Sequence, residues 1–513
     1  MGGHGGRARH LCALILLVGL SHVGAAAHAA DWTDKIKFSG HVQSDIRFMI
    51  EDYRGAVPGD GYKFEMNRND VELKLKIIPN RSVQAVVSGR LRFYGFNEAA
   101  QLTELVGRDK IDPHDLQLNE AYLAVRGKIW DLKVGRMVQT WGTADMFNPT
   151  SNLSSYDFSD PLDYMAKVPN QMVEFDLYPT DWLTIKAVWV PLFKPSLLPP
   201  STYLGFAVET SRDGCFLNAP TPPLSRNDID TLETVFNQYD PCSLNFLTPD
   251  MAVVIPEFSI ANSQAAIKTQ FRFALGDVGD LDFSFSYYYG RFSFPIAYTA
   301  AADLMDSATL GPGNLDVMYN VELMYPRMHV AGFDFSFSAA SDKVPGLFGE
   351  LAVTFPEEVI FGLAVLRNDV ILDNLQMSSV NVPTTPFVKA TVGLDYTFTK
   401  WLYVNVQYVR GFMDEFNDAY GIHNYVVPAL EMKFLDNVLQ FRIAAAWNVD
   451  DLSAAMFPQM TWVAAPSVEL ILGVWVYLGD TKPRDSKSYG GRYKFGQKAA
   501  GRSVVYLKGK VSW

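Results

Sequence analysis

Apolar and polar residues alternate strictly in segment 36–50, which reads IKFSGHVQSDIRFMI. One phase includes Phe38 and Ile46, and the other includes Lys37, Asp45 and Arg47. Because successive side chains of an extended chain point to opposite faces, this segment predicts a strand with one apolar and one polar face. Tilted, it is long enough to cross a hydrocarbon layer. The final segment, 505–513, alternates in the same way, so the two ends of the chain predict a sheet closed into a barrel.

The alternation recurs in hairpins along the whole chain, with short and long connections taking turns. This asymmetry is typical of a transmembrane antiparallel β-barrel with short periplasmic turns and long extracellular loops. Strands of ten or more residues disfavour the alternative of a soluble β-sandwich. We predict an all-β fold of 18–20 strands, with 20 as the best count and 18 if the weak hairpin around 347–367 is miscounted. The predicted short turns lie near 79–81, 126–128, 178–182, 276–279, 325–327, 356–358, 398–401, 435–437 and 465–466, and the long connections near 140–170, 193–262, 292–315, 368–385, 413–423 and 479–502.

The N-terminus has the pattern of a secretory signal peptide. Arg7 and Arg9 precede the apolar run 11–20, and Ala27-His28-Ala29 fits a small-x-small cleavage site. We therefore predict a signal peptide over 1–29 and a single outer-membrane barrel domain over 30–513 of a Gram-negative cell. The partners expected for such a barrel are outer-membrane lipid and the barrel assembly machinery. Outer-membrane barrels commonly end on an aromatic residue that this machinery reads, and the sequence ends on Trp513.

Composition excludes several function classes. The formal net charge is −12 and no strongly basic segment is present, which argues against a nucleic-acid partner. The histidines after the signal peptide are His41, His114, His329 and His423, and the sequence has no G-x-S-x-G, H-E-x-x-H or phosphate-binding glycine motif. Asp228 and Asp230 lack the glycine and glutamate of a calcium loop. We therefore expect neither an enzyme nor a cofactor or metal site.

Segment 132–179 carries a family resemblance. LKVGRMVQTWGTADMFNPTSNL, followed by FSDPLDYMAKVPNQMVEFDLYP, resembles Gram-negative barrels with a VGRQ…WG segment, including alginate-export-type porins and allied proteins of unknown function. In such barrels the following segment tends to enter or cap the lumen. Met137 stands where Gln is usual, so no side-chain role carries over there. From the residues alone, the Trp-Gly and Asn-Pro pairs predict only a strand exit and a turn. The resemblance implies a pore wall or constriction built by Arg136, Trp141, Gly142, Asp145, Asn148 and Pro149.

Cations recur on the inward phases of the first three strands and the last. If the barrel closes, they form one wall that would attract anions. Inward acids, among them Asp45 and Glu72, leave open the alternative of mutually paired charges that fill space. The expected selectivity residues are Lys37, Arg47, Lys74, Lys76, Arg90, Arg92, Lys508 and Lys510.

Two cysteines remain after the signal peptide, Cys215 and Cys242, both within the long 193–262 connection. In an oxidising compartment they predict a disulfide, most simply a staple against proteolysis.

These patterns together predict a porin-like channel for diffusion or facilitated diffusion of small, anionic solutes or oligosaccharides. Two alternatives remain open: an export channel for an anionic polysaccharide, and a non-conducting adhesin or receptor barrel that acts through its long loops. The alternation does not determine the oligomeric state.

Overall fold

The computed structural model describes residues 35–50, 64–96, 110–160, 162–163, 165–198, 244–246, 250–306, 313–341, 343–368, 370–371, 376–418, 421–450, 452–478 and 503–513. Within these ranges the regular structure is almost entirely strand, and no helix is long and apolar enough to cross a membrane. The predicted signal peptide and disulfide lie outside the described residues, as do Asp228 and Asp230.

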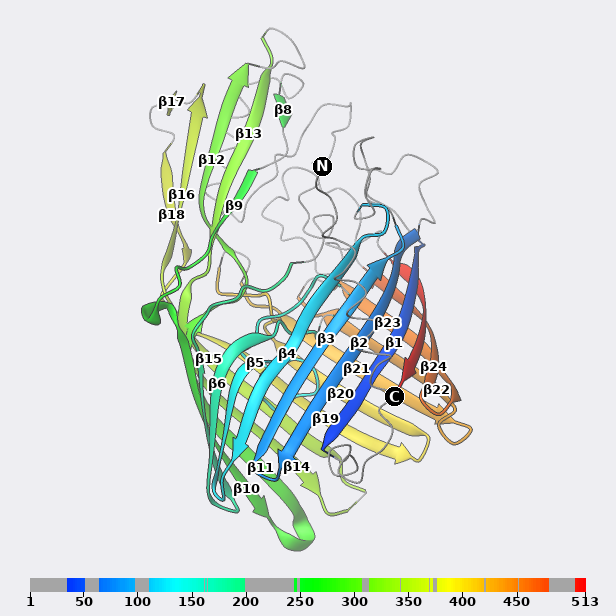
Figure 1. The fold of residues 1–513 in the computed structure, drawn as a ribbon. Coiled ribbons are helices and arrows are strands. Elements are labelled where there is room, and N and C mark those ends of the chain that lie inside the picture. The colour runs from blue at the N-terminus through cyan, green and yellow to red at the C-terminus, as the bar shows by residue number, and fades with distance from the viewer. Residues whose placement is uncertain are drawn as a thin grey trace, which may run out of the picture.

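An 18-stranded antiparallel sheet closes into a barrel (Figure 1). Each strand pairs with the next in the series, and β25 pairs with β1, where Gly40 and Trp513 exchange backbone hydrogen bonds of 3.1 and 3.0 Å. The predicted closure is thus confirmed. In order around the barrel, the strands are β1 (Ile36–Met49), β2 (Phe64–Asn80), β3 (Val83–Tyr94), β4 (His114–Arg126), β5 (Trp130–Met137), β6 (Asn170–Thr180), β7 (Leu183–Val190), β10 (Gln264–Ala274), β11 (Gly279–Arg291), β14 (Arg327–Ala339), β15 (Gly346–Pro356), β19 (Phe387–Thr399), β20 (Leu402–Arg410), β21 (Asn424–Phe434), β22 (Leu439–Asn448), β23 (Ala454–Ala465), β24 (Val468–Leu478) and β25 (Val504–Ser512).

The two phases of each strand have opposite environments. On β1, Phe38 and Val42 are exposed on the outside, whereas Asp45 and Arg47 are buried on the inside. This is the reverse of a soluble protein, in which apolar side chains are buried and charged ones are exposed. The alternation therefore sorts side chains between an apolar outer surface and a polar interior.

The barrel has a short-turn end and a long-loop end. The described turns after β2, β4, β6, β10, β19, β21 and β23 are short, as predicted, and β1 begins and β25 ends at the same end (Figure 1). One further short turn joins β14 to β15 between Ala339 and Gly346, which the sequence pattern did not reveal. The predicted short turns at 325–327 and 356–358 are wrong in their placement, because both lie at the long-loop end.

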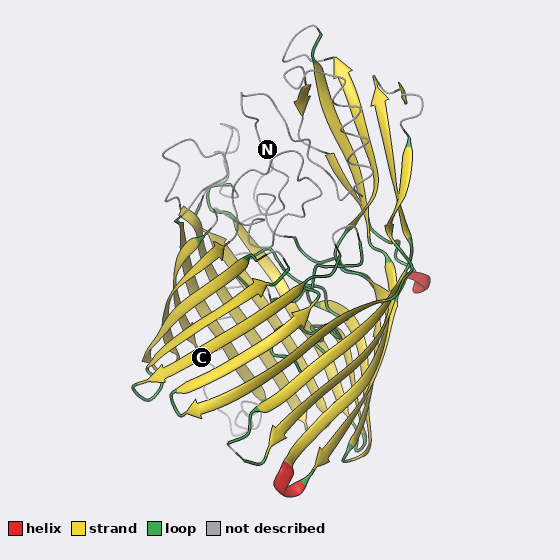
Figure 2. Ribbon diagram, turned by 180° about the vertical axis from the view of Figure 1, so that it is seen from behind, coloured by secondary structure: helices red, strands yellow, loops and turns green. Residues whose placement is uncertain are grey.

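Strands in the long connections form a second sheet beyond the long-loop end of the barrel, which we call the upper sheet (Figures 1 and 2). Three consecutive connections of the barrel contribute to it, and β12 pairs in parallel with β16. Counting β13 and β16 as barrel strands yields the predicted best count of 20; the barrel itself has 18, the lower value of the predicted range. The upper sheet consists of β8 (Leu244–Phe246), β9 (Asp250–Val254), β12 (Ile296–Asp306), β13 (Leu315–Met324), β16 (Val359–Arg367), β17 (Val370–Ile371) and β18 (Met377–Val382).

Candidate functional site: a loop across the barrel lumen

Residues 138–169, between β5 and β6, form a loop that we call the crossing loop. Its apolar side chains Trp141, Leu153 and Tyr156 are buried, although connections usually run over a protein surface. They belong to one cluster with inward-facing residues of distant wall strands, including Val330 of β14 and Phe387 of β19. This burial packs the loop inside the barrel.

Glu350 of β15 anchors one side of the crossing loop. Its Oε1 accepts hydrogen bonds of 2.7 Å from the backbone N–H groups of Thr143 and Ala144 and from Asn148 Nδ2. Its Oε2 accepts one of 2.8 Å from Thr150 Oγ1. Bonds to a buried carboxylate are stronger than neutral ones, so this one side chain fixes a whole turn of the loop.

Two further contacts fit the same turn to the wall. Gly142 has φ +107°, and a Cβ atom there would collide with the carboxylate of Glu350. Only glycine adopts this conformation at low cost while allowing so close an approach. On the neighbouring strand β19, Thr391 donates a hydrogen bond of 2.7 Å to the carbonyl of Phe147.

Asp160 anchors the other side of the crossing loop, to β1 and β2. Its carboxylate forms contacts of 2.6 and 2.7 Å with Arg47 and one of 2.9 Å with Arg68. Burial alone would raise the pKa of Asp160, but the hydrogen bonds from Arg47 and the charges of both arginines hold that pKa below its usual range. The anchor is therefore a carboxylate that stays ionised.

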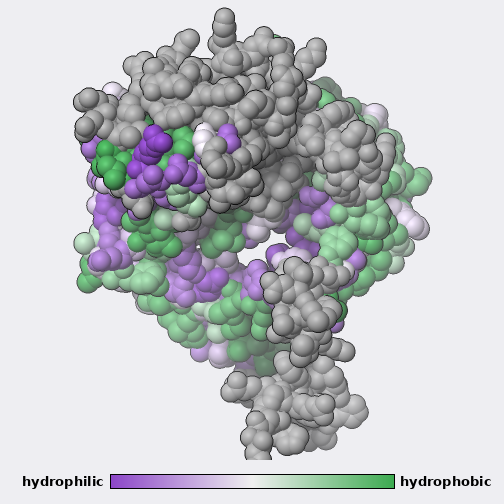
Figure 3. Space-filling model, turned by 90° about the horizontal axis from the view of Figure 1, so that it is seen from above, coloured by the Kyte–Doolittle hydropathy of each residue, from purple (hydrophilic) through white to green (hydrophobic). Residues whose placement is uncertain are grey.

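The two anchors lie on opposite walls. Around the sheet, strands β3 to β14 separate β2 from β15 on one side, and β20 to β25 separate β19 from β1 on the other. A loop fixed to β15 and β19 at one point and to β1 and β2 at another must span the lumen. Viewed from the long-loop end, the barrel is hollowed, and hydrophilic residues border the hollow (Figure 3).

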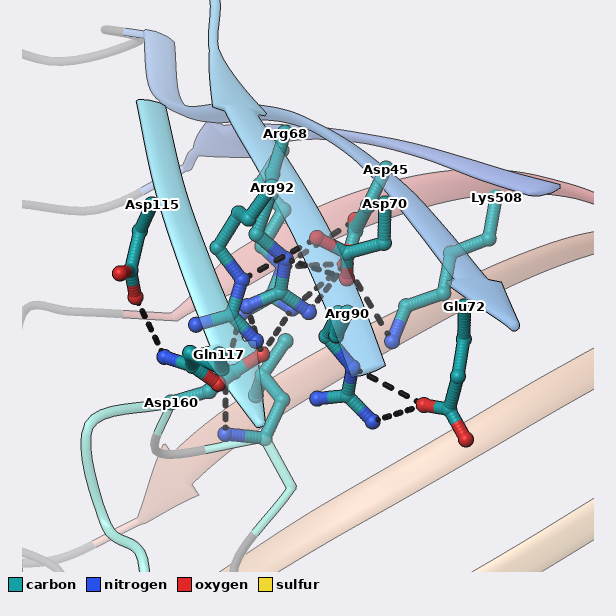
Figure 4. Close-up of polar contacts among 12 residues, drawn as sticks. Asp45, Arg68, Asp70, Glu72, Arg90, Arg92, Asp115, Gln117, Asp160 and Lys508 are labelled. Carbon is teal, nitrogen blue, oxygen red and sulfur yellow. Dashed lines mark hydrogen bonds and ion pairs between the residues drawn. The ribbon is translucent and has the colours of Figure 1, made fainter. Parts of the chain in front are cut away.

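Most of the predicted cation wall is paired with carboxylates (Figure 4). Arg47 contacts both Asp45 and Asp160 at 2.6 Å. Inside a barrel, such pairs keep buried charges compensated. The other pairs within this wall are Arg90 with Glu72 at 2.7 Å, Arg92 with Asp70 at 3.1 Å, Lys74 with Glu120 at 2.6 Å and Lys508 with Asp45 at 3.4 Å.

Three predicted cations have no carboxylate within ion-pair distance among the described residues: Lys37, Lys76 and Lys510. Lys37 and Lys76 lie directly opposite each other on β1 and β2, near the short-turn end. Like charges in this arrangement repel each other, so an anion between them would be stabilised.

Arg136 lies elsewhere than the resemblance implied. It shares the outward phase of β5 with Val134, which is exposed, and its Nε donates a hydrogen bond of 2.6 Å to the carbonyl of Leu118. The other implied residues are in the crossing loop. Trp141 is buried in the apolar cluster, Gly142 and Asn148 contact Glu350, Asp145 is exposed, and the Pro149 carbonyl accepts a hydrogen bond from Asn152.

A second connection, 411–423 between β20 and β21, lies against the crossing loop. Together they border a pocket that also includes Thr354 and Lys389 of the wall. Glu415 holds this connection closed by accepting hydrogen bonds from the N–H groups of Phe412 and His423 and from the hydroxyl of Tyr425. Burial opposes ionisation of Glu415, but these bonds and the His423 ring lower its pKa to about 2.

Sequence reasoning missed the residues that position the crossing loop. Glu350, Asp160, Arg68 and Thr391 are each far in sequence from their partners; Glu350 and Thr150, for example, are 200 residues apart. One signal was present: a carboxylate on the inward phase of the strand GLFGELAVTF, whose only other polar side chain is Thr354. A buried carboxylate needs donors, but the strand pattern does not name them.

No protein-family model and no curated protein matches the sequence. Among solved structures, the chain is similar to OccAB3 of Acinetobacter baumannii, with 9% identity over 94% of this chain and 99% of that chain and a TM-score of 0.46. It is also similar to the outer-membrane channel DcaP of the same organism, with 11% identity over 93% and 97% and a TM-score of 0.35, and to OmpF of Salmonella typhi, with 9% identity over 94% and 99% and a TM-score of 0.37. At these values the alginate-export-like family is not shown.

Proposed function

We propose that the chain is a porin-like channel through which small solutes diffuse across a Gram-negative outer membrane. The observation that carries this proposal is the combination of a closed barrel, apolar outside and charged inside, with a loop fixed to opposite walls of its lumen. An apolar outer band is compatible with lipid. Closure of the barrel leaves no edge strand with unpaired backbone N–H and C=O groups inside the membrane. Because barrels of this kind have short periplasmic turns, the short-turn end faces the periplasm and the upper sheet lies outside the cell.

We assign the two sets of inward cations different roles. Arg47, Arg68 and Arg92 are each neutralised by a buried carboxylate, so they support the wall and the crossing loop. Lys37 and Lys76 are unpaired among the described residues and adjacent at the periplasmic mouth, so they would bias permeation toward anions. The selectivity site is therefore smaller than the wall expected from the sequence.

Single-channel recording in a planar bilayer under a salt gradient tests this proposal. We expect discrete, steady conductance steps, and a reversal potential of the sign that anion preference produces. Conductance without ion preference would support the channel but remove the assignment to Lys37 and Lys76. A folded protein that gives no steps would overturn the channel.

The upper sheet favours one second candidate, a surface receptor or adhesin. Connections from three consecutive hairpins combine into seven strands, which is more structure than a pore needs at its mouth. Binding of labelled protein to host or bacterial surfaces, by a barrel that is electrically silent, would favour this candidate over the channel.

A further inference from the structure

A short segment with exposed apolar side chains projects from the outside of the barrel where β9 leads into β10. It comprises residues 255–263 and includes the single 3-10 turn η4 (Ile260–Asn262). Ile260 is 85% exposed, more than any other large apolar side chain among the described residues, and Phe258 is 77% exposed. Figure 2 shows η4 in red at the outer edge of the junction between barrel and upper sheet; the second red helix is η5 (Gly276–Val278), in the turn at the short-turn end.

Two arginines hold this segment in place. Arg291 and Arg327 lie directly opposite each other on β11 and β14. Both donate to the side-chain oxygen of Asn262, at 3.0 and 2.5 Å, and Arg327 also donates to the carbonyl of Ala261 at 2.7 Å. Opposed like charges destabilise a strand pair, so their convergence on one amide is a specific arrangement. The exposure of Ile260 therefore belongs to a fixed turn and not to a loose loop.

The segment adjoins a row of outward aromatic side chains with polar tips. Arg327 Nη1 donates a hydrogen bond of 2.6 Å to the hydroxyl of Tyr289, and the hydroxyl of Tyr287 lies 2.6 Å from His329 Nδ1. Further toward the short-turn end, the outward positions of the same strands are Phe285 and Phe333. Tyrosines gather where a membrane meets water, so this row marks the outer membrane boundary.

We propose that Phe258 and Ile260 form a lateral anchor that inserts between outer-leaflet lipids at the level of their headgroups and upper acyl chains. The choice of lipid as occupant rests on the continuity of the segment with the aromatic row and the lipid-facing wall below it. Arg291 and Arg327 act as positioning residues. Because the segment follows β9, which pairs with β13, the anchor also fixes the base of the upper sheet at the membrane surface. The inference presupposes the outer-membrane location of the proposed function.

Photo-crosslinking of the full chain in cells tests the anchor. p-Benzoylphenylalanine replaces Phe258, and adducts are identified by mass spectrometry after illumination. Leu351 on the outer face of β15 serves as the lipid-facing reference, and Val370 on the upper sheet as the reference outside the membrane. We expect lipid adducts at position 258, as at 351, and none at 370.

Other outcomes overturn the inference in distinguishable ways. A crosslinked dimer at position 258 would make the segment an interface between copies of the chain, and an adduct with another protein would make it a docking site for that protein. Absence of any adduct at 258, with lipid labelling at 351, would place the segment above the membrane. Absence of lipid labelling at 351 would instead contradict the proposed membrane location.

A second variant tests the role of the arginines. In Arg327→Gln, position 258 should lose most of its lipid adduct, because Ala261 loses its arginine donor and Asn262 loses one of its two, whereas position 351 should label as before. Unchanged labelling at 258 would show that the arginine does not position the segment.

Discussion

Asp160 of the crossing loop and Arg47 of the first strand form a two-pronged ion pair, with Oδ1–Nη1 at 2.6 Å and Oδ2–Nη2 at 2.7 Å. Both side chains are buried, and Arg47 also contacts Asp45. Separating them would leave each buried charge with one partner fewer, Arg47 with Asp45 and Asp160 with Arg68, which is costly away from water. The pair therefore determines where the crossing loop reaches the far wall of the lumen.

Replacing Asp160 with asparagine should release this side of the crossing loop. The change leaves Arg47 and Arg68 with less compensating charge, and removal of one partner from a buried pair costs about 3–5 kcal/mol. We expect larger and noisier single-channel currents than in the wild type. Asp157→Asn, at a half-buried position of the same loop, is the matched control, because this carboxylate accepts hydrogen bonds from Ser159 and pairs with no cation among the described residues. Identical currents in Asp160→Asn and wild type would show that the pair does not hold the constriction.

Glu350→Ala should release the opposite side of the crossing loop, where it meets β15. Thr143, Ala144, Asn148 and Thr150 would lose their acceptor, and each buried donor left unsatisfied costs about 1–3 kcal/mol. The barrel itself does not depend on these bonds, so we expect faster proteolysis within the crossing loop while the heat-resistant barrel band on a gel persists. Glu358→Ala, an exposed carboxylate just past the same strand, should behave like the wild type. Equal cleavage rates would contradict the anchor.

Reversing Lys37 and Lys76 together to glutamate should move the reversal potential toward cation preference. Neither lysine has a carboxylate partner within the described ranges, so the change alters the field at the mouth without breaking an ion pair. Lys343→Glu combined with Lys400→Glu, both at exposed positions in turns at the same end, provides a charge-matched control. High salt should reduce the shift, because it screens exposed charges. No shift at low salt would remove these lysines from the selectivity site.

The connection between β20 and β21 should loosen in acid. The pKa of Glu415 is about 2 in the folded chain against an ordinary 4.5, so its ionised form contributes about 3 kcal/mol above pH 4.5, and this contribution is lost as the pH falls toward 2. Hydrogen exchange at the N–H groups of Phe412 and His423 should therefore rise between pH 4.5 and 2. In Glu415→Gln, exchange should already be fast at neutral pH and depend little on this interval. Slow exchange in the variant would contradict the role of the carboxylate.

The side-chain direction of Arg136 shows how strand alternation and the family resemblance differ. Strict alternation places Arg136 in phase with Val134, on the outer face, and the structure agrees with the alternation. The resemblance placed it at the pore because it transferred a motif and not a side-chain direction. Within the crossing loop, Trp141 is buried and Asn148 contacts Glu350, although the local sequence predicts only a strand exit and a turn there.

The sequence by itself determined that the eighteen barrel segments are strands, which of their faces is polar and where the barrel closes, because alternation is a local property and a closed sheet leaves little choice of partner for β1 and β25. It did not reveal β8, β9, β12, β17 or β18, which lie within three of the predicted long connections. Only the tertiary structure decided which sheet each strand joins: β13 and β16 alternate like barrel strands yet pair in the upper sheet. The tertiary structure also decided which walls the crossing loop reaches. Glu350 and Asp160 lie far in sequence from the residues they contact, and only the closed barrel brings them together. The sequence of a strand shows that an inward carboxylate needs hydrogen-bond donors, but only the folded chain shows which residues donate to it.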